Sequence, residues 1–327
     1  MTEKNIISVE HLVRKYGKFT AVDDISFQVG AGEIFGFLGP NGAGKSTTIS
    51  ILCTLLKPSS GKATVNGFDV ARQQHQVRQS IGLVFQDPSL DDQLTAQENL
   101  HFHAMVYNIP GSVRKKRIDE ALKMVELDTR RNDIVKNFSG GMKRRLEIAR
   151  GLLHYPKVLF LDEPTLGLDP QTRNRIWEFL LDLRTRENVT IFLTTHYMDE
   201  AEHANRIAII DKGKIIALDT PDKLKDMVGG DIINLKTVDD KKAADEISQR
   251  YRMQATDGHG ELLLEVANGD EFIPTLVRDL NTRIISISLR RPTLEDVFLK
   301  LTGRAIRDSE VSSMEAIKSH MRFHGRR

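Results

Sequence analysis

The stretch AGEIFGFLGPNGAGKSTTISILCTLL, residues 31–56, contains a short apolar run, a glycine-rich loop and a longer apolar stretch. The first run, Ile34–Leu38, has the length of a buried strand, and Thr47–Leu56 has the length of a helix. Between them, Gly39–Ser46 fits the phosphate-binding pattern G-x-x-x-x-G-K-[ST]. A strand, a glycine loop and a helix in this order predict an α/β fold whose loop holds phosphate groups.

The residues of this loop suit a nucleoside triphosphate with a divalent metal. Glycines let backbone N–H groups turn toward phosphate oxygens because no Cβ stands in the way. Lys45 supplies a cation for the β- and γ-phosphates, and the Ser46 hydroxyl is placed to ligate Mg²⁺. A turn that only joins a strand to a helix is the alternative, and the lysine and serine in register argue against it. The predicted nucleotide-binding loop consists of Gly39, Pro40, Asn41, Gly42, Ala43, Gly44, Lys45, Ser46 and Thr47.

A second predicted strand ends in two acids. In KVLFLDEP, the apolar run Val158–Leu161 precedes Asp162 and Glu163. Ligands in open α/β sheets bind at the carboxyl ends of strands. We therefore expect Asp162 to hold Mg²⁺ through its water shell and Glu163 to accept a proton from the attacking water. Two solvated turn residues are the alternative, which the glycine loop disfavours.

Composition narrows the possible classes of protein. The 327 residues are 40% hydrophobic, enough for one large domain with a smaller domain or tail. Lys+Arg 47 against Asp+Glu 45 gives a formal net charge of +2, so no overall basic field points to nucleic acid. Cys53 is the single cysteine and the N-terminal stretch MTEKNIISVE has no signal-like apolar run, so we expect a reduced, cytosolic setting. The apolar runs have strand length and are too short to cross a bilayer.

The segment NFSGGMKRRLEIAR, residues 137–150, offers a second place for an anion, with a serine and two glycines before a helical run. It resembles the signature loop of ATP-binding cassette (ABC) ATPases, and it lies between the glycine loop and Asp162 as that family requires. Further matches follow in the family's order, and the resemblance covers about residues 4–225. The further matches are Tyr16, Gln86, the turn Gly167–Pro170 and His196.

This resemblance implies an architecture and a dimer. The expected cassette, residues 1–225, has a RecA-like core with an antiparallel β subdomain and a helical subdomain inserted at about residues 90–155. In the family, the signature loop closes over ATP bound to a second, head-to-tail subunit. ATP would then hold two cassettes together, and hydrolysis would release them. The signature residues are Ser139, Gly140, Gly141 and Met142.

The resemblance also assigns roles to single residues. Tyr16 would stack on adenine, with a lone exposed tyrosine in a turn as the alternative. Gln86 would contact Mg²⁺ and the water, and His196 would bond the γ-phosphate. Asp169 would couple the two sites across the dimer. The expected catalytic set is Lys45, Gln86, Glu163 and His196, and the expected Mg²⁺ ligands are Ser46, Gln86 and Asp162.

Two features resemble one group within the family. Phe138 and Met142 replace the usual leucine and glutamine of the signature, giving FSGGM. This form, and PTLEDVFLKLTGR at residues 292–304, resemble the ATPases of drug and lipid exporters of the daunorubicin-resistance type. The resemblance implies an ATPase that drives export of a drug-like or lipid-like compound.

The segment after residue 225 has a different pattern. The apolar alternation predicts a small α+β domain at 226–304 with the order β-α-β-β-α-β. We find no catalytic cluster in it, so a dimer-stabilising or regulatory role rests on the resemblance. Residues 305–327 form a basic tail, which we expect to be solvated, with an anionic membrane surface as the alternative partner.

The family also implies partners and a place in the cell. We expect two cassettes to pair on ATP binding and to act on a separately encoded integral membrane permease, at the cytoplasmic face of the membrane. A soluble cassette ATPase remodelling ribosomes or DNA is one alternative, disfavoured because the chain has one glycine loop, one signature and no long heptad region. An ABC import ATPase is the other, disfavoured only by FSGGM and the C-terminal resemblance. We expect no nucleic-acid partner.

Overall fold

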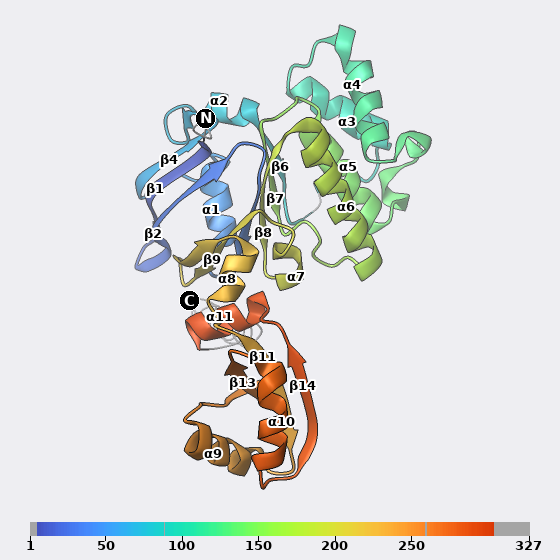
Figure 1. The fold of residues 1–327 in the computed structure, drawn as a ribbon. Helices are drawn as coiled ribbons and strands as arrows, with labels where there is room; N and C mark the ends of the chain where they lie inside the picture. Colours follow the sequence, from blue (N-terminus) through green and yellow to red (C-terminus); the bar gives the residue numbers. More distant parts are fainter. Residues whose placement is uncertain (1–4, 88, 259, 304–327) are drawn as a thin grey trace, which may run out of the picture. The chain divides into compact units, whose positions relative to one another are not determined.

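The computed structural model describes residues 5–87, 89–258 and 260–303, and it has strand β3 (Ile34–Leu38) within a six-stranded sheet (Figure 1). Strand β3 pairs in parallel with β8 and β9, and β7 pairs in parallel with β8 and β6. Parallel strands end at one edge, so the segments that follow them meet there. The sheet order is β10 (Lys214–Asp219), β9 (Arg206–Asp211), β3, β8 (Thr190–Thr195), β7 (Val158–Asp162) and β6 (Ile81–Val84).

An antiparallel sheet packs on this one through aromatic side chains. Its order is β2 (Phe19–Gly30), β1 (Asn5–Tyr16), β4 (Ser60–Val65) and β5 (Phe68–Asp69). The ring centroid of Phe27 in β2 lies 5.5 Å from that of Phe35 in β3 and 6.1 Å from that of Phe192 in β8. The expected antiparallel β subdomain is therefore joined to the α/β core by one continuous apolar interior.

Helix α1 (Lys45–Leu52) follows β3 and is shorter than the predicted Thr47–Leu56. It begins directly after Gly44 and ends because Thr54 has a φ of +64°, a left-handed conformation that cannot continue a helix. The backbone N–H of Leu55 then donates to the carbonyl of Ser50 at 2.8 Å. The residues after Leu52 thus form a turn in which Cys53 and Leu56 pack on the core while Leu55 is exposed, and the helical prediction was wrong for them.

Three helices form the inserted helical subdomain, which has its own core around Leu100, Leu122 and Leu146. Figure 1 shows α3 and α4 together at one end of this part of the chain, away from β1, β2 and β4. Helix α3 begins with a capping box made by Thr95 and Glu98, which satisfies free N–H groups of its first turn. The helices are α3 (Ala96–Val106), α4 (Gly111–Met124) and α5 (Gly140–Leu152), and the cassette also contains α2 (Gln74–Ser80), α6 (Pro170–Glu187) and α7 (Met198–Ala201).

The chain divides into two compact units, and the second begins at Asp219. Its sheet is antiparallel with the order β12, β13, β11, β14, and α9 and α10 pack on it around Ile233, Leu264 and Leu276. Helices α8 and α11 pack against each other. The predicted order β-α-β-β-α-β is present, and the predicted tail at 305–327 lies outside the described residues. The elements are α8 (Pro221–Asp226), β11 (Asp231–Thr237), α9 (Asp240–Tyr251), β12 (Thr256–Gly258), β13 (Glu261–Val266), α10 (Gly269–Asp279), β14 (Ile284–Arg290) and α11 (Leu294–Thr302).

Within the described ranges, the helices are all too short or too polar to cross a bilayer.

Cys53, at the end of α1, is buried. Burial raises the pKa of its thiol well above the ordinary value, and the nearby charge of Asp162 acts in the same direction.

We predict that Phe192→Ala lowers the free energy of unfolding of the first unit by about 3–5 kcal/mol, because Phe192 is fully buried among four aromatic rings. The single tryptophan, Trp177, is buried in α6, so urea unfolding followed by its fluorescence reports on this unit. Phe102→Ala is the matched control, because Phe102 is 59% exposed. Equal urea midpoints for the two variants would contradict this account of the core.

Candidate functional site

A cavity of about 470 Å³ lies beside the glycine loop. Tyr16 ends β1 and Phe19 begins β2, so this hairpin supplies an aromatic wall. Gln86 follows β6 and Glu163 follows β7, and both side chains reach the same cavity. The lining residues are Tyr16, Phe19, Ala21, Asn41, Gly42, Gly44, Lys45, Ser46, Thr47, Gln86 and Glu163.

The glycine loop has a conformation that requires glycine at two positions. Gly44 has a φ of +109°, and a Cβ there would lie 2.5 Å from the carbonyl oxygen of Ala21. A Cβ at Gly39 would lie 2.3 Å from the carbonyl oxygen of Ile210. The side chain of Lys45 is buried and donates to the carbonyls of Gly39, at 2.7 Å, and Pro40, at 3.1 Å. Gly39, Pro40 and Ala43 therefore shape the loop without lining the cavity.

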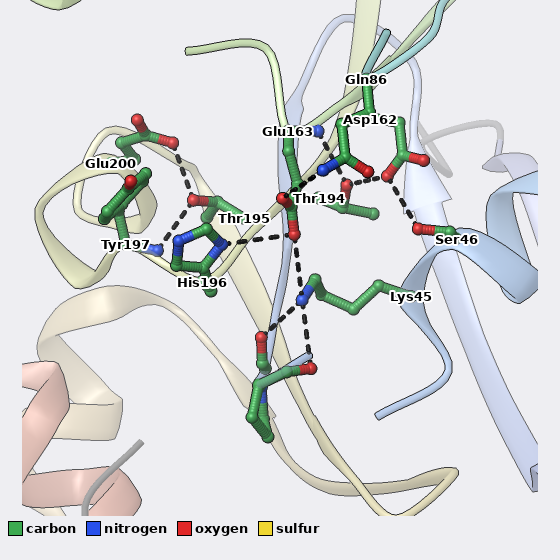
Figure 2. A network of polar contacts seen from close by, with 12 residues as sticks. Lys45, Ser46, Gln86, Asp162, Glu163, Thr194, Thr195, His196, Tyr197 and Glu200 are labelled. Atoms are coloured by element: carbon green, nitrogen blue, oxygen red, sulfur yellow. Dashed lines mark hydrogen bonds and ion pairs between the residues drawn. The ribbon is translucent and has the colours of Figure 1, made fainter. Parts of the chain in front are cut away.

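Oxygen atoms suited to Mg²⁺ meet at the start of α1. The Ser46 Oγ donates to Asp162 Oδ1 at 3.3 Å, and Thr194 Oγ1 donates to the same oxygen at 2.5 Å (Figure 2). Among the described residues, no three His, Cys, Asp or Glu side chains form a metal cluster. A hydroxyl and one carboxylate, completed by phosphate oxygens and water, form a hard-oxygen set of the kind that Mg²⁺ takes in nucleotide sites. The residues present fit that ion.

Glu163 is the meeting point of the polar network in Figure 2. Lys45 Nζ lies 3.2 Å from Glu163 Oε1, and His196 Nδ1 lies 3.3 Å from the same oxygen. Gln86 Nε2 donates to Glu163 Oε2 at 3.4 Å. The other three side chains of the predicted catalytic set therefore each reach the carboxylate of Glu163.

The environment of Glu163 keeps it ionised. Burial raises the pKa of this carboxyl, but the interaction with His196 and the charge of Lys45 lower it by more, so the net pKa lies below the ordinary value. An ionised carboxylate in this position can accept a proton from a water molecule. Its backbone φ is +47°, a left-handed conformation that residues other than glycine rarely adopt and that is concentrated at functional sites.

The predicted signature residues lie at the N-terminus of α5 and outside the cavity. Ser139 is the N-cap, and its Oγ accepts from the backbone N–H of Met142 at 3.3 Å. A Cβ at Gly141 would lie 2.3 Å from Cγ2 of Thr172 in α6, so glycine is required by this helix contact. Ser139 and Gly140 are exposed. Met142 is partly buried and Gly141 is buried, so only the first two signature residues lie on the surface of the chain.

Asp169 is the N-cap of α6, the helix whose Thr172 packs on Gly141. Its Oδ1 accepts from the backbone N–H of Thr172 at 3.0 Å, and its Oδ2 accepts from the Thr172 hydroxyl at 2.6 Å. These hydrogen bonds lower the pKa of Asp169. Because Thr172 also packs on Gly141, Asp169 and the signature loop share one neighbour.

Sequence reasoning missed Glu200, which follows His196 by four residues. Its carboxylate accepts from the hydroxyls of Thr165 and Thr195, the latter at 2.7 Å, and Arg173 Nε lies 3.6 Å away. Burial is the main cause that raises its pKa to about 7. In the sequence, DEAEH looks like an exposed acidic helix, so nothing indicated a buried acid.

Arg144 was also missed as an individual residue within the cation run 143–145. Lys143 and Arg145 are partly exposed, whereas Arg144 is buried. The spacing of Arg144, Glu147 and Arg150 places charges of alternating sign on one face of α5, which is a signal that the sequence contained.

A second cavity, of about 410 Å³, lies beside Phe85, the residue before Gln86. Leu55, Phe85 and Val106 line it although each is well exposed. Phe102 and Met105 are also exposed and share a face of α3 with Val106. We call the three exposed lining residues Leu55, Phe85 and Val106, together with Phe102 and Met105, the apolar groove.

Comparison with known families and proteins agrees with this geometry. Residues 22–166 match the family described as ABC transporter, and residues 220–302 match the family described as ATP-binding protein DrrA1-3-like, C-terminal domain. The chain is 40% identical over 321 residues to the daunorubicin resistance ATP-binding protein DrrA2 of Streptomyces coeruleorubidus, covering 93% of this chain and 97% of that protein. It is 39% identical over 312 residues to the linearmycin resistance ATP-binding protein LnrL of Bacillus subtilis (strain 168), covering 93% of this chain and 100% of that protein.

Solved structures show the same fold. The chain is similar to cbiO1 of Clostridium perfringens, part of the ABC transporter complex cbiONQ, with a TM-score of 0.64 and 30% identity over 76% of this chain and 97% of that one. It is also similar to the ATP-binding cassette MJ0796 in a dimeric, post-hydrolysis state bound to ADP and Pi, with a TM-score of 0.59 and 29% identity. This match covers 65% of this chain and 98% of that one.

We predict that Glu200→Gln removes a pH-dependent loss of stability. Because the folded pKa of Glu200, about 7, lies above its ordinary value of 4.5, the folded state binds the proton more tightly than the unfolded state. The stabilisation that Glu200 contributes should therefore be fully present below pH 4.5 and be lost as the pH rises through 7. Between pH 5 and 8 the wild-type protein should lose roughly 1–3 kcal/mol relative to the variant.

Calorimetric melting at pH 5, 6, 7 and 8 measures this difference. Glu202→Gln, which neutralises an exposed carboxylate on the same segment, is the matched control and should follow the wild-type curve. Parallel curves for Glu200→Gln and wild type would show that Glu200 does not titrate in this range.

Proposed function

The chain belongs to the ATP-binding subunits of ABC transporters, in the drug-resistance group with a DrrA-like C-terminal domain, and it is an ATPase. From that premise we propose that two copies enclose two Mg-ATP and drive a separately encoded membrane permease that exports a drug-like or lipid-like compound. The observation that carries this proposal is the cavity that gathers Tyr16, Lys45, Ser46, Gln86 and Glu163 from separate segments of the chain.

Within one copy, each residue has a role that its position supports. Tyr16 stacks on the adenine, and backbone N–H groups of the loop residues that line the cavity, from Asn41 to Thr47, surround the phosphates. Lys45 contacts the β- and γ-phosphates. Its Nζ lies 3.2 Å from Glu163, so the γ-phosphate would compete with this carboxylate for the cation, and the carboxylate can take a proton from the attacking water. His196, beside Glu163, bonds the γ-phosphate.

The metal site supplies the remaining charge neutralisation. Mg²⁺, when bound, offsets negative charge on the β- and γ-phosphates. Ser46 would ligate it directly, Asp162 would hold it through water, and Gln86 would contact it from the segment after β6. Thr194 orients the Asp162 carboxylate through its 2.5 Å hydrogen bond.

The second copy completes each site. The signature residues Ser139, Gly140, Gly141 and Met142 lie at the N-terminus of α5 and do not line their own cavity. Ser139 and Gly140 are exposed there, which suits contact with ATP on another chain. Asp169 couples the two sites through Thr172, which packs on Gly141. MJ0796, a cassette of the same fold, is described as dimeric.

The apolar groove is the proposed docking surface for the permease. Large exposed apolar side chains grouped on one surface mark interaction sites, and Phe85 adjoins Gln86, so docking there can reach the catalytic segment. Docking on the permease would put the protein at the cytoplasmic face of the membrane, which is part of the proposal. Import ATPases share the catalytic residues, but the long matches to resistance proteins favour export.

The domain boundaries are part of the same proposal. We assign residues 1–225 to the cassette, with its helical subdomain at about 90–155, and residues 226–304 to an accessory domain that stabilises the dimer or regulates it. The match of residues 220–302 to the DrrA1-3-like C-terminal family supports a separate role for this segment.

We predict that Glu163→Gln retains ATP binding, lowers turnover by roughly 10²–10⁴-fold and traps the dimer, because the water loses its base while both phosphate contacts remain. Light scattering with and without Mg-ATP should show the mass doubling. Lys45→Ala/Glu163→Gln is the matched control and should stay monomeric, since Lys45 makes the charge-assisted phosphate contact. A Glu163→Gln protein that binds ATP at unchanged mass would contradict ATP-driven pairing of the isolated chain.

We also predict that Val106→Asp abolishes co-purification of a multi-spanning membrane protein, because a charge in the apolar groove is costly to bury. ATPase activity of the isolated chain should stay within about twofold of wild type, since Val106 does not line the nucleotide cavity. Val238→Asp, at a residue 63% exposed in the second unit, is the control. Mass spectrometry of solubilised membranes identifies the partner, and its retention by Val106→Asp would place docking elsewhere.

A further inference from the structure

Arg144 is a buried cation whose guanidinium reaches two separate segments of the backbone. Nη1 donates to the carbonyl of Phe85 at 2.6 Å, and Nη2 donates to that of Gln86 at 3.3 Å. On the other segment, Nη2 donates to the carbonyl of Glu163 at 3.1 Å and Nε donates to that of Pro164 at 2.5 Å. One side chain thus holds the backbones on which the proposed catalytic residues Gln86 and Glu163 stand.

These two segments follow neighbouring strands. Strands β6 and β7 pair in parallel, with Val84 opposite Leu161, so the segments leave the sheet side by side. No hydrogen bond between the backbones of residues 85–87 and 163–164 is present within the described part of the chain. Arg144 therefore joins the two segments just beyond Val84 and Leu161, the last residues paired between β6 and β7.

Glu147 and Arg150, on the same face of α5, hold Ser89 in the segment that follows β6. The fully buried Glu147 accepts from Arg144 Nη1 at 3.1 Å and from the backbone N–H of Ser89 at 2.8 Å. Arg150 donates to the carbonyl of Ser89 at 2.6 Å. The segment that bears Gln86 is therefore fixed to α5 on both sides of that residue.

We propose that Arg144 is a positioning residue that locks the Gln86 and Glu163 segments to α5, so that ATP turnover requires the shape of its guanidinium and not only its charge. The inference rests on the roles proposed above for Gln86 and Glu163. The N-cap of α5 is Ser139, a residue proposed to meet the second copy's ATP. The same helix thus carries the contact to the neighbour and the support for its own catalytic groups.

The guanidinium suits this task for a geometric reason. Its donors lie in one plane and point in several directions, so one arginine can serve four carbonyls and a carboxylate together. A lysine places one small charge at one point and cannot reach both segments. If Arg144 served only as half of a buried ion pair, replacing both partners by neutral groups would leave kcat unchanged, because such a pair can be replaced with little loss of stability.

The test uses two variants of the full-length protein. Arg144→Lys keeps the charge opposite Glu147, and Arg144→Met/Glu147→Gln removes both charges while Gln can still accept from Ser89. The control is Arg184→Lys, because Arg184 also donates from a partly buried guanidinium to a backbone carbonyl, that of Gly32 at 2.8 Å, away from the nucleotide cavity. For each protein, kcat, KM for ATP and the melting temperature are measured.

We expect both variants to melt within a few degrees of wild type, to keep KM within about twofold, and to lose at least about tenfold in kcat. The control should keep wild-type kcat. A kcat within twofold of wild type in either folded variant would overturn the inference, and so would failure of both variants to fold, since Arg144 would then act in stability. A wild-type protein without ATPase activity would overturn the proposed function itself, which separates the two failures.

Discussion

The parallel pairing of β3 with β8, and of β8 with β7, is the constraint on which the candidate site depends. In this register Leu38 lies opposite Thr195, and Asp162 lies opposite Thr194. The residues that follow these strands, the glycine loop, Glu163 and His196, therefore leave the sheet together. A shift of one residue in either pair would turn alternate side chains to the other face and separate Lys45, Glu163 and His196.

Much of this arrangement was predictable because the signals are local. The glycine loop, the acids after Val158–Leu161 and the apolar strands each depend on a few consecutive residues, and the alternating pattern at 226–304 indicated the second unit's element order. The length of α1 was predicted wrongly, since apolar content does not distinguish a helix from a buried turn. The left-handed conformation of Thr54 had no local signal.

The residues that were missed depend on contacts between distant segments. Glu200 is buried where Thr165, from a distant segment, and the neighbouring Thr195 both donate to it, and Arg144 is buried where two loops converge on it. A single sequence shows such residues only as charges on helices. The two cases also show how the fold limits the cost of burial, since each charge has several polar partners.

The buried thiol of Cys53 has a practical consequence. It is the only cysteine in the chain, and with its pKa raised by burial it carries little of the thiolate that reacts with alkylating reagents. A cysteine introduced at an exposed position would then be the one thiol open to labelling. The natural protein is in this way a ready background for attaching spectroscopic probes, with which distances between two copies can be followed through a catalytic cycle.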